Sequence, residues 1–93
     1  MIIQIFLIFH SLENNKNINE LNLELCKNIK DFSIISNLVK LENLNLTNTN
    51  ISDISFLEKN KNIKKLDLDG CYGIIDYSFI SNLEKNKNIY IFK

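Results

Sequence analysis

The sequence predicts an α/β solenoid, in which short parallel strands lie side by side and short helices or turns connect them. One residue pattern starts at Ile18, Leu41 and Ile63 and begins again at Ile89, so successive copies are 23, 22 and 26 residues apart, within the range of known repeat architectures. Each copy contains leucines two residues apart with polar residues between them, which is typical of a half-buried strand. A unit of this size cannot bury its apolar face alone, so the copies are expected to stack and their strands to pair in parallel.

The strand of each copy is predicted from this period-two alternation. Successive side chains of a strand point to opposite faces, so both leucines of an x-Leu-x-Leu-x segment face the core and the polar residues face outward. The predicted strands are Glu20–Leu25, Asn43–Asn48 and Lys65–Gly70.

The segment after each strand is predicted to begin a helical turn. Each copy continues with Asp-x-Ser and a pair of apolar residues, and the aspartate or serine can cap the free N–H groups of a helix. Asp31, Asp53 and Asp76 are therefore interpreted as caps, since calcium-binding repeats carry denser glycine and aspartate patterns. The third copy has extra polar residues at Glu84–Asn88, which are predicted to form a surface loop.

Cys26, Thr49 and Cys71 occupy equivalent positions between the strand and the turn. The two cysteines are two copies apart, which places them about 10 Å from each other when neighbouring strands are about 4.8 Å apart. A disulfide requires closer Cα atoms. We therefore expect reduced thiols, and small polar atoms that bond to the backbone of the turns.

The chain is predicted to form a single domain over residues 1–93. Its first part is interpreted as a partial repeat or an N-terminal cap, because residues 8–18 align position by position with residues 79–89. Its last part is interpreted as a truncated final strand, in which Phe92 follows Ile89 as Leu66 follows Ile63. The predicted parts are residues 1–17, 18–40, 41–62, 63–88 and 89–93.

The apolar segment Met1–Phe9 is too short to span a membrane, since a spanning helix needs about 20 apolar residues and polar residues follow from His10. It lacks the basic start and the small-residue cleavage site of a secretory signal. It is expected to be an end strand or a cap, with a signal as the alternative. Two cysteines are too few for a disulfide scaffold, and these features together predict a cytoplasmic location.

Composition and motifs exclude several classes of function. The net charge is zero and arginine is absent, which disfavours nucleic acid as a partner. No nucleophile–base pair, metal-ligand set or phosphate-binding glycine loop is present, so we expect no catalytic residues, no metal and no cofactor. The one histidine, His10, is expected at the polar edge of the first turn.

The pattern Leu-x-x-Leu-x-Leu-x-x-Cys/Asn/Thr-x-Ile covers residues 18–83 and resembles the leucine-rich repeat family. The segment Ile63–Leu83 resembles the cysteine-containing repeats of F-box substrate adaptors. The segment from Leu44 to Leu57 is closer to the 22-residue repeats of internalin-like proteins. The resemblance implies a parallel sheet on a concave face, short helices or turns on a convex face, and partner proteins that dock on the concave face.

This concave face is expected to carry the outward side chains of the strands as three ladders across the sheet. Polar side chains on a rigid sheet are suited to partner binding. Tyr72, in the turn between Gly70 and Gly73, is predicted to be the best single anchor for a partner, since exposed aromatic residues are favoured at interfaces. The predicted partner-binding residues are Glu20, Asn22, Glu24, Asn43, Asn45, Thr47, Lys65, Asp67, Asp69 and Tyr72.

The function expected from these features is a non-catalytic module that binds another protein. One alternative is the substrate-recognition part of an F-box-type ubiquitin-ligase assembly, which would require a separate F-box module. Another is an inactive fragment of a longer repeat protein. The apolar segments Met1–Phe9 and Ile89–Phe92 also make end-to-end self-association a prediction.

Overall fold

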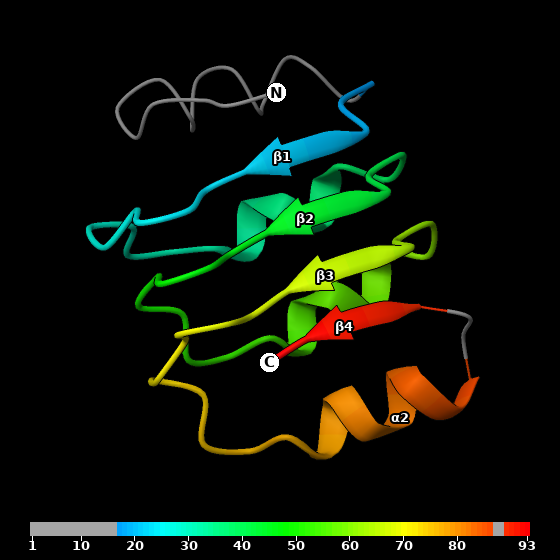
Figure 1. The fold of residues 1–93 in the computed structure, drawn as a ribbon. Helices are drawn as coiled ribbons and strands as arrows, with labels where there is room; N and C mark the ends of the chain where they lie inside the picture. The colour runs from blue at the N-terminus through cyan, green and yellow to red at the C-terminus, as the bar shows by residue number, and fades with distance from the viewer. Residues whose placement is uncertain (1–16, 87–88) are drawn as a thin grey trace.

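A computed structural model describes residues 17–86 and 89–93 as one sheet covered by short helices (Figure 1). The sheet is parallel, and its strands follow chain order. They are β1 (Glu20–Asn22), β2 (Asn43–Asn45), β3 (Lys65–Asp67) and β4 (Tyr90–Phe92). The 3₁₀ helices η1 (Ser33–Asn37) and η2 (Ser55–Lys59) and the α-helix α2 (Ser78–Asn86) alternate with them. The predicted α/β repeat solenoid is confirmed, whereas the expectations for Met1–Phe9 and His10 lie outside the described residues.

The core lies between the sheet and the helices. The middle residues of the four strands, Leu21, Leu44, Leu66 and Ile91, are paired in register. A second inward column follows two residues later, and its members, Leu23, Leu46 and Leu68, are buried. Each helix contributes an inward residue, which is Ile35, Leu57 or Ile80. The leucines therefore face the core as predicted.

The strands end earlier than predicted, at Asn22, Asn45 and Asp67. In each of these residues the side-chain Oδ1 accepts the backbone N–H two residues further on, at 2.9, 2.9 and 3.1 Å respectively. This Asx turn bends the chain out of the extended conformation. The ladder of hydrogen bonds nevertheless continues, since the N–H groups of Leu23 and Leu46 donate to the carbonyl oxygens of the neighbouring strands at 2.8 and 2.9 Å.

The predicted strand ends lie instead in the left-handed region, which a strand does not enter. Leu25, Asn48 and Gly70 have φ angles of 66°, 57° and 74°. At Gly70 a Cβ atom would clash with Asn48 Oδ1, so any other residue would have to displace that side chain. Glycine also adopts this conformation without the steric cost that Leu25 and Asn48 carry.

The helices differ between the copies. The first two copies close through five-residue 3₁₀ helices, whereas the third contains the nine-residue helix α2. The prediction of a loop at Glu84–Asn88 is therefore wrong for its first three residues, which belong to α2. A 3₁₀ helix rises about 2.0 Å per residue and an α-helix about 1.5 Å, so the longer third copy has enough residues to cover a similar distance in the α conformation.

The aspartates before the helices act as predicted. Asp53 Oδ1 accepts the backbone N–H of Ser55 at 2.9 Å and its hydroxyl at 2.7 Å. Asp31 and Asp76 accept the backbone N–H of the serine two residues on at 2.9 Å each. In all three, the serine side-chain and backbone bonds lower the pKa of the carboxyl below its ordinary value.

Two members of the cysteine and threonine column, Cys71 and Thr49, have the predicted structural role. The buried Cys71 thiol donates to the carbonyl oxygen of Leu46 at 2.9 Å, and Thr49 Oγ1 lies 3.6 Å from Cys71 Sγ. Both cysteines are free thiols. Burial raises the pKa of the Cys26 thiol.

The register of β4 corrects one prediction. The spacing of Ile89 and Phe92 placed Phe92 beside Leu66, whereas the structure pairs Ile91 with Leu66. The residues after Ile89 are thus shifted by one position, and a shift by one residue turns every side chain of a strand to the opposite face. Tyr90 and Phe92 consequently lie outward and are exposed.

Candidate functional site

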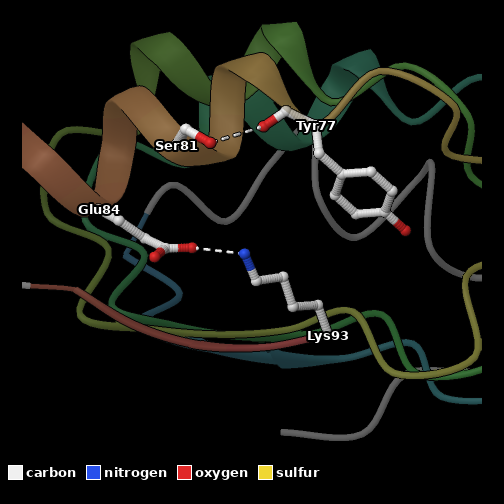
Figure 2. Close-up of polar contacts among 4 residues, drawn as sticks. All are labelled: Tyr77, Ser81, Glu84 and Lys93. Atoms are coloured by element: carbon white, nitrogen blue, oxygen red, sulfur yellow. Dashed lines mark hydrogen bonds and ion pairs between the residues drawn. The ribbon is translucent and has the colours of Figure 1, made fainter.

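The candidate site is the open face of the sheet, which we define as the face opposite the helices. Figure 2 shows the helices on one side of the strands only. Strand register and alternation place two rows of side chains on the open face, and a third row follows the strand ends. The first row is Glu20, Asn43, Lys65 and Tyr90; the second is Asn22, Asn45, Asp67 and Phe92; the third is Glu24, Thr47 and Asp69.

The second row is partly engaged by the chain itself. Its Asn22, Asn45 and Asp67 side chains are half-buried, and each uses Oδ1 to accept a backbone N–H. These residues therefore shape the strand ends. All four residues of the first row are exposed, as are Glu24 and Asp69 of the third. These two rows therefore offer more accessible polar groups than the second row does.

An aromatic pair lies at the β4 side of the open face, and sequence reasoning missed it. The Tyr90 and Phe92 ring centroids are 5.3 Å apart with a tilt of 39°, and the two residues are 69% and 43% exposed. Lys65 Nζ, from the neighbouring strand, lies 5.6 Å from the Phe92 ring centroid. The signal that could have found the pair is the sequence Tyr-Ile-Phe, whose central aliphatic residue matches the x-Leu-x pattern of the other strands.

The open face is acidic although the whole chain is neutral. Its rows contain four carboxylates, Glu20, Glu24, Asp67 and Asp69, and one ammonium group, Lys65. Two ion pairs lie outside these rows. Lys64–Glu42 (2.9 Å) joins the residues directly before β3 and β2, and Lys93–Glu84 (2.8 Å) joins the end of the sheet to α2. Figure 2 shows Lys93 reaching across to Glu84, beside the bond from the Ser81 hydroxyl to the Tyr77 carbonyl.

Tyr72 lies apart from these rows. It is in the turn that follows β3, and it is 92% exposed. Ile75, two residues beyond Gly73, is equally exposed. The structure therefore aligns six of the predicted residues in register on one face. The other four follow the strand ends, with Tyr72 in the turn after β3.

Depressions formed by the described residues lie on both sides of the sheet. The one on the open face has a volume of about 100 Å³, whereas small-molecule sites occupy about 300–1,000 Å³. A larger depression of about 420 Å³ lies on the helix side near Asp31 and Asp53, whose carboxylates already accept bonds from Ser33 and Ser55. In the described part of the chain, no three His, Cys, Asp or Glu side chains are grouped to hold a metal ion.

Comparison with known proteins identifies one family. A family model described as "Leucine Rich repeats (2 copies)" matches residues 39–88, which is more than half of the 93 residues. Comparisons with curated proteins and with solved structures give no match. Across the residues that the structure covers, none of the helices has the length and apolar character needed to cross a membrane.

Proposed function

Because this chain belongs to the leucine-rich repeat family, we propose that it is a non-catalytic module that binds another protein on the open face of its sheet. Leucine-rich repeat domains generally mediate protein–protein interactions and are typically non-catalytic. The observation that supports the choice of face is that the outward residues of the strands form two rows in register above a buried leucine core.

The rigidity of this face favours binding. The leucines beneath it are almost fully buried, and close-packed side chains have little freedom to move. The second row is held further by its bonds to the backbone. A partner would thus meet an ordered sheet and the ordered side chains of Asn22, Asn45 and Asp67, which lowers the entropy cost of association.

Site-specific photo-crosslinking tests the proposal. A photoreactive residue at Asn43, exposed on the open face, is compared with one at Glu58, exposed on η2. We expect a partner to crosslink from position 43 and not from position 58, and unlabelled protein to compete for it. A partner that crosslinks only from position 58 would contradict the assigned face.

Three other predictions are tested separately. The ubiquitin-ligase role rests on the resemblance of the third copy to cysteine-containing repeats, but Cys71 has a structural explanation in its bond to Leu46. Recovery of a ligase scaffold with the crosslinked partner would support that role. An inactive fragment, or end-to-end self-association, would appear in solution sizing as a poorly folded or an oligomeric species. A monomer with a cooperative melt argues against both.

A further inference from the structure

Resting on the proposed function, we infer that the partner segment is basic and places a lysine or arginine side chain on the Tyr90–Phe92 ring pair, beside Asp67. Tyr90 and Phe92 are the large exposed aromatic residues on the open face. Exposed aromatics surrounded by polar residues are the usual anchors of an interface. The chemistry of their neighbours determines which group they receive.

The ring pair already accommodates a cation. Lys65 Nζ lies 5.6 Å from the Phe92 ring centroid, within the distance at which an ammonium group is attracted by an aromatic face. Tyr90 pairs with Lys65 in register and is 69% exposed, which leaves much of its surface open to a second cation.

Charge around the rings favours a basic partner. Asp67 is the register neighbour of Phe92, and the exposed Asp69 follows two residues further along the same chain segment. Neither carboxylate forms an ion pair within the part of the chain that the structure covers. A cation over the rings would gain their attraction, whereas an acidic segment would meet a face with four carboxylates and one ammonium group.

The test uses two synthetic eight-residue peptides, one alternating lysine with threonine and the other alternating glutamate with threonine. Both are extended and polar, and they differ in the sign of their charge. Binding is followed by the NMR signals of the Tyr90 and Phe92 rings at low ionic strength. We expect the lysine peptide to shift these signals saturably and the glutamate peptide to leave them unchanged.

Three variants separate the contributions. Phe92→Leu keeps an apolar side chain but removes the ring, and we expect it to weaken binding of the lysine peptide roughly twofold to fivefold. Lys65→Ala removes the competing cation and is expected to tighten binding. Tyr77→Leu removes an exposed ring directly before α2, on the helix side of the sheet, and is the matched control, with no expected change.

The peptide and variant measurements either support or overturn the inference of a basic partner. Saturable shifts with the lysine peptide, together with weaker binding by Phe92→Leu, support it. Binding of the glutamate peptide, or weaker lysine-peptide binding by Lys65→Ala, overturns it, as does the absence of ring shifts with both peptides. The open-face function is judged independently by crosslinking from position 43, so a basic-partner failure is distinguishable from failure of the proposed function.

Discussion

Leu46 shows what a single inward residue contributes. It is 0% exposed, and aspartate there would bury a charge without a partner, at a cost of several kcal/mol against a total stability of about 5–15 kcal/mol. We expect Leu46→Asp to be unfolded by circular dichroism. Asn45→Lys should fold, with a loss of about 1 kcal/mol, because it removes only the bond to the Thr47 N–H. A normal urea melt for Leu46→Asp would show that the faces are reversed.

The aspartates that cap the helices make the folding stability depend on pH in the acidic range. Bonds from Ser55 lower the pKa of the Asp53 carboxyl, so the unfolded chain binds its proton more readily than the folded chain does. The stabilisation is complete above the unfolded pKa of about 4 and is lost as the pH falls through the folded value. Asp53→Asn keeps the Oδ1 acceptor but does not titrate.

We therefore expect the urea midpoint of Asp53→Asn to fall less than that of the natural chain between about pH 5 and about pH 2. The two proteins should behave alike near neutral pH if the amide oxygen retains the Ser55 bond. Equal losses on acidification would mean that this cap does not contribute to the pH dependence.

At the scale of elements, Asn60 joins consecutive copies. It is buried, and its Nδ2 donates to the carbonyl oxygens of Ile35 and Leu38 at 3.0 and 3.2 Å, where η1 ends. The equivalent residue of the preceding copy is the buried Leu38. Among the described residues, Asn60 Oδ1 is buried without a hydrogen-bond partner, so the stabilising polar contacts of this side chain are the two bonds from Nδ2.

Exchanging Asn60 separates its shape from its hydrogen bonds. Asn60→Asp keeps the shape but turns a carboxylate oxygen toward two carbonyls, and we expect a loss of about 3 kcal/mol or more. Asn60→Leu imitates the preceding copy and should lose about 1–3 kcal/mol. Urea denaturation measures both, and an aspartate variant as stable as the leucine variant would contradict the role given to Nδ2.

Element existence could be predicted from the sequence, and element ends could not. Leucines two residues apart locate each strand, and Asp-x-Ser locates each helix. The strand ends depend on whether Asn22 or Asn45 turns its side chain onto the backbone, which alternation does not reveal. The α conformation of α2 likewise depends on how many residues the third copy has available, as the helical residues Glu84 and Lys85 show.

At the scale of the whole molecule, the repeat spacing predicted the stacking of copies because each copy needs its neighbours to bury its apolar face. Most of the open face followed from the same periodicity. The aromatic pair Tyr90–Phe92 could not be predicted in this way. Aligning Ile89 with Ile63 places Phe92 at the position of the inward Leu66. The structure pairs Ile91 with Leu66 instead. The register of β4 is therefore set by burial of its aliphatic residue and not by the repeat spacing.

The register of β4 against β3 can be tested by measuring the stability of two variants. Ile91 is half-buried and packs against the core, whereas Phe92 is 43% exposed on the open face. Ile91→Asp brings a carboxylate into the apolar side of β4 and should lower stability by a few kcal/mol (about 2–4). Phe92→Asp should change stability by less than about 1 kcal/mol. Urea melts of the matched pair distinguish the two registers, because a one-residue shift would reverse the order and remove Tyr90 and Phe92 from the open face.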